Sequence, residues 1–159
     1  MSAQDFQQFL AQHPFTRQLQ PRHIECLAAQ ARAASFAPDQ VIFRSGDENT
    51  DFYMIVSGRV ALELPVGERM LRIQTLSDGD EFGFSALIMG RGMTFQARAL
   101  RQVEALAFEG SRLIEACRVD PELGFGLMRQ LLLIVSERLD ATRLQLMDTY
   151  SPVAARAGA

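Results

Sequence analysis

The fold of this chain is indicated most directly by residues 52–64, which read FYMIVSGRVALEL. The first five residues are apolar, aromatic or β-branched, which is typical of a buried strand, and Ser57-Gly58 marks a turn. Residues 59–64 then alternate between apolar and polar side chains, as expected of a half-buried strand. The alternation predicts that three side chains face the core (Val60, Leu62 and Leu64) and that two face solvent (Arg59 and Glu63). The stretch therefore predicts two consecutive strands.

Further short strands are expected on both sides of this stretch, separated by turns such as Asp78-Gly79-Asp80. They cover residues 41–43, 71–75, 94–100 and 103–108. Residues 4–34 carry helical spacing instead, broken at His13-Pro14. The predicted fold class is mostly β with α, a jelly-roll or double-stranded β-helix roll. Its parts are an N-terminal helical segment (1–35), the β-roll (36–118), a long C-terminal helix (119–150) and a frayed tail (151–159).

The long C-terminal helix is predicted from Asp120-Pro121-Glu122, which combines a cap, a proline for the first helical position and an acid. Gly124 and Gly126 are the two places where its first turns would break. Apolar residues and two threonines then follow heptad spacing, which favours a parallel helix pair and hence a homodimer. That seam is formed by Leu132, Val135, Leu139, Thr142, Leu146 and Thr149. A second stripe (Leu127, Leu131, Ile134 and Ala141) would face the roll; the alternative is one broad core face.

Composition excludes several function classes. The 159 residues carry a formal net charge of -3, so the strong basic footprint of a nucleic-acid binder is missing. Two histidines and two widely spaced cysteines form no metal-binding motif, and no catalytic set is recognisable, so neither an enzyme nor a metal site is predicted. No apolar run is long enough to span a membrane, and no signal peptide is recognisable. We therefore expect a cytoplasmic protein with reduced thiols.

Two motifs carry a family resemblance. Residues 46–60, GDENTDFYMIVSGRV, and residues 76–83, LSDGDEFG, place four glycines at a characteristic spacing around the strand of Tyr53 and Ile55. This pattern resembles cyclic nucleotide-binding domains, and most of all the sensor half of CRP/FNR regulators. The resemblance covers roughly residues 15–150. It implies a β-roll with a long C-terminal helix and a phosphate-binding cassette within residues 79–95, and therefore a cyclic nucleotide as the ligand.

The cassette departs from the family pattern at its two polar anchors. The family sequence reads roughly G-E-x-A-L and then, after a loop, R-(S/T)-A, where the glutamate holds ribose and the arginine holds the cyclic phosphate. Here the glutamate position is Phe84 and the arginine position is Met93. Losing two charge-assisted contacts should weaken binding by about a hundredfold or more. The ligand-binding segment implied by the resemblance comprises Gly83, Phe84, Ser85, Ala86, Arg91, Met93 and Thr94.

Three interpretations of this cassette remain open. In the first, it is closed by its own apolar side chains (Phe84, Met89, Met93 and Phe95). In the second, it holds a different small-molecule effector. In the third, it binds a cyclic nucleotide weakly, through Arg91 and the backbone N–H groups of residues 84–86 at the start of a short helix.

The last part of the chain indicates whether the protein could bind DNA itself or act through a partner. Residues 137–142, ERLDAT, resemble the helix stretch that presents a threonine to the adenine base across the family dimer, so Thr142 is either a ligand contact or a polar seam residue. Only nine residues follow Tyr150, too few for the family's DNA-reading domain, so direct DNA binding is not expected. The predicted function is a stand-alone sensor acting through an unidentified partner protein. The alternative is a ligand-free interaction or structural subunit.

Overall fold

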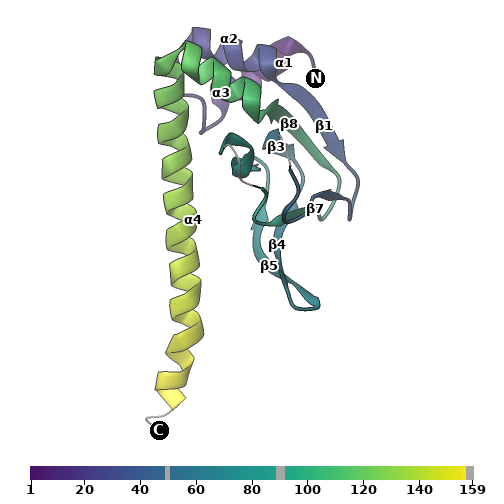
Figure 1. The fold of residues 1–159 in the computed structure, drawn as a ribbon, viewed down its shortest axis with the longest axis vertical. Coiled ribbons are helices and arrows are strands. Elements are labelled where there is room, and N and C mark those ends of the chain that lie inside the picture. Colours follow the sequence, from purple (N-terminus) through teal and green to yellow (C-terminus); the bar gives the residue numbers. More distant parts are fainter. Residues whose placement is uncertain (49–50, 89–91, 157–159) are drawn as a thin grey trace.

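The computed structural model describes residues 1–48, 51–88 and 92–156 of the chain (Figure 1). Within these residues, four α-helices and one short 3-10 helix accompany eight strands. The helices are α1 (Ala3–Gln12), α2 (Pro21–Gln30), η1 (Phe84–Leu87), α3 (Gly110–Val119) and α4 (Pro121–Arg156). The strands are β1 (Arg32–Phe36), β2 (Val41–Phe43), β3 (Asp51–Ser57), β4 (Val60–Val66), β5 (Arg69–Leu76), β6 (Glu81–Phe82), β7 (Gln96–Ala99) and β8 (Val103–Glu109).

The strands form two antiparallel sheets of four strands, in the orders β1-β8-β3-β6 and β2-β7-β4-β5. One buried cluster draws side chains from both sheets, among them Ile55, Val60, Ala97 and Val103, and forms the interior of the roll. The alternate residues of β3 and β8, such as Met54 and Leu106, join a second cluster with α1, α2, α3 and the start of α4. The predicted jelly-roll class, flanked by N-terminal and C-terminal helices, is confirmed.

Three local predictions are wrong, two of them because a distant partner overrides the local pattern. The predicted helical spacing ran to residue 34, but residues 32–36 form β1, which pairs with β8 over five positions. Residues 110–118, which were predicted to belong to the roll, form α3 together with Val119. Glu63, predicted to face solvent, is 3 % exposed. Its carboxylate accepts two hydrogen bonds from Arg98, at 2.7 and 2.8 Å, which compensates the burial of its charge.

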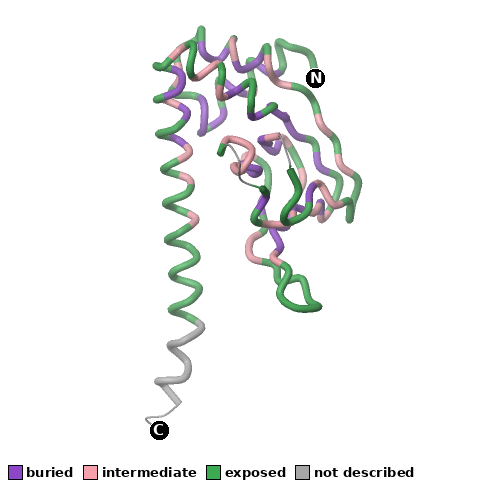
Figure 2. The backbone as a smooth tube through the Cα atoms, in the orientation of Figure 1, coloured by how far each residue is buried: buried purple, intermediate pink, exposed green. Residues whose placement is uncertain are grey.

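Helix α4 is continuous from Pro121 to Arg156, so Gly124 and Gly126 do not break it and most of the predicted tail is helical. A Cβ at Gly124 would lie 3.0 Å from the Cys117 carbonyl oxygen, and one at Gly126 would lie 2.6 Å from a Leu19 methyl carbon. These glycines therefore allow the close packing of α4 against its neighbours. Figure 1 shows α4 beside the sheets and projecting beyond them, and Figure 2 shows that its described distal part is exposed.

The described helices include none with both the length and the apolar character needed to cross a bilayer, the long α4 among them.

Candidate functional site

A cavity of about 250 Å³ lies where the cassette, the second sheet and the middle of α4 meet. Most of its wall is apolar. Its lining residues are Phe43, Leu62, Ile73, Gln74, Phe82, Gly83, Phe84, Ser85, Met93, Thr94, Phe95, Val135, Arg138, Leu139 and Thr142. The volume is slightly below the range of about 300–1,000 Å³ typical of small-molecule sites. The cavity is thus suited to a compact, mainly apolar molecule.

The structure places most of the predicted cassette residues in this wall. Gly83, Phe84, Ser85, Met93 and Thr94 all line the cavity. Ala86 does not: it packs against the interior of the roll, and its N–H donates to the Gly83 carbonyl at 3.0 Å, so this amide is not directed at a ligand. Arg91 and Met89 lie outside the described residues, and the predicted role of Arg91 stays a prediction.

Gly83 sets the direction of the cassette. Its φ of +83° is in the left-handed region, and a Cβ there would lie 2.6 Å from the backbone oxygen of Asp51. Only glycine fits both conditions without strain. The turn at Gly83 lets η1 begin directly after β6, which places Phe84 in the cavity wall.

Apolar packing surrounds Phe84 and Met93, the two positions predicted to replace the polar anchors of the family pattern. Phe84 lies against Phe52, with ring centroids 5.6 Å apart. Met93 is 4 % exposed, and its backbone bonds to Gly46 and Asp47 tie the two loops together at 2.7 and 3.1 Å. These two side chains do not fill the cassette completely, because the cavity remains beside both of them.

Arg138 is a cavity residue that the sequence reasoning missed. Its guanidinium donates a hydrogen bond to the Glu81 carbonyl oxygen and lies over the Phe84 ring, 4.7 Å from the centroid. Such a cation–π contact is stronger where water is excluded. Burial lowers the pKa of Arg138, and the nearby Glu81 opposes that shift. The sequence could have placed Arg138 in the site, because it precedes Thr142 by four residues and the two therefore share a helix face.

The carboxyl group of Glu81 is buried behind Arg138, in an unusual electrostatic setting. Burial raises its pKa to about 7, against an opposing effect of Arg138 and with added repulsion from Asp80 and Glu137. The Nδ1 of His13 lies 3.8 Å from the Glu81 carboxylate and accepts a bond from the Phe15 N–H at 3.1 Å. Burial also lowers the pKa of His13. This carboxyl group is therefore a weak counter-charge for Arg138 near neutral pH.

The predicted seam residues divide into two groups. Val135, Leu139 and Thr142 line the cavity, whereas Leu132 and Leu146 do not. The four apolar members are exposed to 67 % (Leu132), 48 % (Val135), 49 % (Leu139) and 55 % (Leu146). The Thr142 hydroxyl donates to the Arg138 carbonyl at 2.9 Å, so it is bonded within its own helix. Thr149 lies beyond the residues whose side chains are described.

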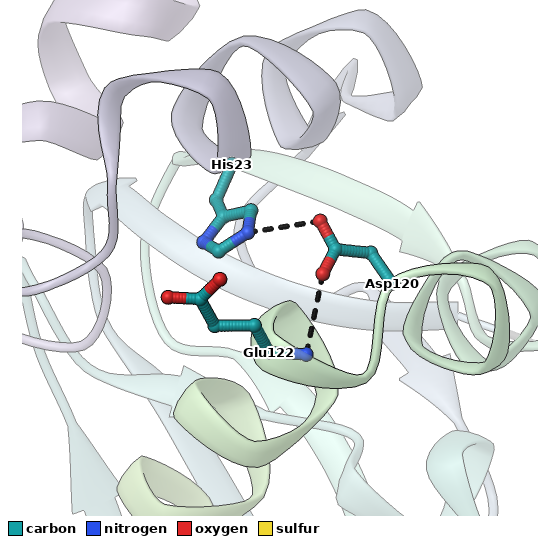
Figure 3. Close-up of side chains that lie close together, drawn as sticks. All are labelled: His23, Asp120 and Glu122. Atoms are coloured by element: carbon teal, nitrogen blue, oxygen red, sulfur yellow. Dashed lines mark hydrogen bonds and ion pairs between the residues drawn. The ribbon is translucent and has the colours of Figure 1, made fainter.

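A second polar cluster fixes the start of α4 to α2. The Nε2 of His23 lies 3.0 Å from Asp120, which also caps α4 by accepting from the Glu122 N–H at 3.2 Å (Figure 3). The ligand atoms of His23, Asp120 and Glu122 lie within 4.8 Å of one another, a grouping that could hold a cation and that a 97-residue separation hides in the sequence. The Arg22 guanidinium, however, pairs with both carboxylates at 2.7 and 2.6 Å. These ion pairs explain the cluster as a structural contact between α2 and the start of α4, called the Arg22–Asp120 clasp below.

Comparison with known proteins agrees with this geometry. The cyclic nucleotide-binding domain family matches residues 33–120. A putative cyclic nucleotide-binding protein from Geobacter metallireducens superposes with a TM-score of 0.73 at 24% identity, over 87% of this chain and 98% of that one. The catabolite activator protein of Thermus thermophilus gives 0.69 at 23% identity, over 87% and 63%. This chain belongs to the cyclic nucleotide-binding domain family, and it shares its fold with these two proteins.

Two further matches cover only part of the proteins concerned. The cAMP-bound regulatory domain of Toxoplasma gondii protein kinase A superposes with a TM-score of 0.73 at 18% identity, over 85% of this chain and 50% of that one. A cAMP/cGMP-dependent phosphodiesterase B of Dictyostelium discoideum is 33% identical over 75 residues. That match covers 47% of this chain and 7% of the phosphodiesterase. A regulatory or sensor role is therefore supported by the family and the fold.

Proposed function

We propose that this chain is a cytosolic, homodimeric sensor domain that passes the state of its cavity to a partner protein through α4. The observation that carries the proposal is that Val135, Leu139 and Thr142 both line the cavity and lie on the predicted seam. A ligand that fills the cavity must therefore touch the same side chains that a second α4 would contact. The two free thiols of Cys26 and Cys117 fit a reducing compartment.

The proposed mechanism is a shift between two arrangements of α4. Helix α4 is held firmly at its start by the Arg22–Asp120 clasp, and Arg138 holds its middle against η1. Residues 139–148 of α4 are exposed, so this described part of the helix makes little contact with the roll. A ligand that displaces Leu139 or Arg138 would move the free half of the helix around the fixed half. The energy of that shift equals the difference in ligand affinity between the two arrangements.

Dimerisation is tested by a pair of charge substitutions on α4. Leu139→Glu puts a charge on the proposed seam and should weaken association by about tenfold or more, because apolar burial is lost in both copies. Leu144→Glu is the matched control: this side chain is 63 % exposed but lies off the heptad seam. Light scattering coupled to size-exclusion chromatography separates the cases. If both substitutions weaken association equally, the proposed seam is wrong.

Classical cyclic-nucleotide recognition is proposed to be weak in this chain, because Phe84 and Met93 give neither a ribose acceptor nor a phosphate donor. The double substitution Phe84→Glu with Met93→Arg should create measurable cyclic AMP affinity by calorimetry, whereas the wild type binds at least about a hundredfold more weakly. Each single variant serves as a control. A folded double variant that stays inert would show that these positions do not correspond to the family's anchors.

The second candidate function is a docking subunit without a ligand. It is supported by the close packing of Phe84 on Phe52 and by the burial of Met93. This candidate predicts that the oligomeric state of the protein does not change with any small molecule. The sensor proposal predicts the opposite, and light scattering with and without a bound ligand distinguishes them.

A further inference from the structure

Building on the proposed sensor function, we propose that the cavity binds an apolar carboxylate. Its carboxylate group pairs with the guanidinium of Arg138, and its hydrocarbon or aromatic body lies between Phe84 and Leu139. The ligand class is thus a small organic acid with one negative charge and an apolar remainder. Charge, hydrogen-bonding capacity and shape each support this assignment separately.

The charge of the cavity is positive. Among the lining residues that the structure describes, Arg138 alone carries a formal charge. The carboxyl groups of Glu81 and Asp80 both act on Arg138, but Glu81 is buried and its pKa is raised to about 7, so it neutralises the guanidinium only in part near neutral pH. An incompletely balanced guanidinium in an apolar wall is a strong attractor for an anion, because the low dielectric strengthens the pairing.

The hydrogen-bonding capacity of Arg138 is mostly unused. A guanidinium has five N–H donors in a planar fork, which suits a carboxylate. Within the described parts of the chain, only one acceptor lies within hydrogen-bond distance of them, the carbonyl oxygen of Glu81. The guanidinium lies over the Phe84 ring, and this contact holds the side chain in place without using the remaining donors. The structure therefore offers a carboxylate a preformed partner.

The shape and polarity of the cavity select the rest of the ligand. The volume of about 250 Å³ equals that of about eight water molecules at roughly 30 Å³ each, which suits a ligand of about ten non-hydrogen atoms. Side chains such as Phe43, Leu62 and Phe82 line the wall. Burial against them favours a hydrocarbon chain or a single aromatic ring. A ribose would meet few polar partners there.

The test uses octanoate and 4-phenylbutanoate against the full chain, with octanamide and 4-phenylbutanamide as neutral analogues of the same shape. Calorimetry should show binding of both acids, with the amides at least about tenfold weaker, since one charge-assisted contact is lost. Arg138→Met should weaken the acids at least about tenfold as well, and Arg138→Lys should retain part of the affinity. Arg143→Met, one to two turns further along α4, is the control and should bind like the wild type. Circular dichroism confirms that each variant is folded.

The outcomes separate this inference from the proposed function. Acids and amides that bind equally, or acids that bind equally to Arg138→Met, would overturn the role of the guanidinium. Binding of cyclic AMP but of neither acid would overturn the ligand class and leave the sensor function standing. If neither the acids nor cyclic AMP or cyclic GMP bind, both proposals fail and the docking subunit is favoured.

Discussion

Replacing Glu81 by glutamine tests whether this buried carboxyl group is uncharged in the folded protein. The folded-state pKa of about 7 lies above the ordinary value of 4.5, so the folded state binds the proton more tightly than the unfolded chain does. Stability from this group is fully present below pH 4.5 and is lost as the pH rises through 7. The difference makes the ionised form less favourable in the folded protein by on the order of 3 kcal/mol.

The Glu81→Gln variant keeps the size and removes the ionisation. At pH 4 its free energy of unfolding should match that of the wild type, and at pH 8 it should be higher by up to about 3 kcal/mol. Urea unfolding followed by circular dichroism at the two pH values measures this. The control, Glu68→Gln, changes an exposed carboxylate in the β4–β5 turn and should differ from the wild type equally at both pH values.

The result that would refute this reasoning is a Glu81→Gln variant that is less stable than the wild type at pH 8. Several charges surround the group: Arg138 and Glu137 on α4, Asp80 in the preceding turn and His13 after α1. If the attraction of Arg138 dominates, the carboxylate is ionised and paired, and its loss destabilises the fold. The sign of the change at pH 8 thus decides between burial and pairing, and also shows how much positive charge Arg138 has left for a ligand.

Two further stability predictions follow from the fold. Glu63→Gln should destabilise the protein by about 2 kcal/mol, because the buried side chain loses charge-assisted hydrogen bonds from Arg98, which is itself 30 % exposed. Hydrogen bonds from Arg98 lower the pKa of Glu63, so the loss measured by urea unfolding should shrink as the pH falls below about 4.5. Gly83→Ala should lower the free energy of unfolding by about 2 kcal/mol or more, because the backbone is left-handed there and the added Cβ would also clash with the backbone oxygen of Asp51. Gly67→Ala, left-handed but with nothing within 4 Å, should cost only about 1 kcal/mol; equal losses would contradict the steric argument.

The strands and turns of this fold were predictable because their signals are local. The apolar run of β3, the turn at Ser57-Gly58 and the Asp120 cap of α4 each depend on a few neighbouring residues. Glycines at the family spacing also mark left-handed turns in the structure, as Gly58 and Gly79 show. These features survive folding because the tertiary structure agrees with the local preference.

The errors arose where a distant partner decides the outcome. The sequence ARAAS reads as helical, yet β8 supplies a pairing edge that makes it a strand. The charge of Glu63 suggests a solvent-facing position, yet Arg98 on the neighbouring strand β7 makes its burial acceptable. Neither partner is identifiable from spacing along the chain, because both lie more than thirty residues away. Local propensity is a weak guide wherever such pairing is available.

The candidate site was predicted only in part, again because one of its residues lies far away along the chain. The cassette residues that line the cavity follow from the family motif, but the charge that the cavity holds does not, because Arg138 lies on another element. Without the glutamate of the family pattern, the described wall contains a base and no acid. The Phe84 ring gives Arg138 an aromatic surface, and the described wall offers the guanidinium no acidic partner inside the cavity. A site altered in this way would reject a polar ligand that needs an acceptor at position 84, while its preference for a negative charge remains.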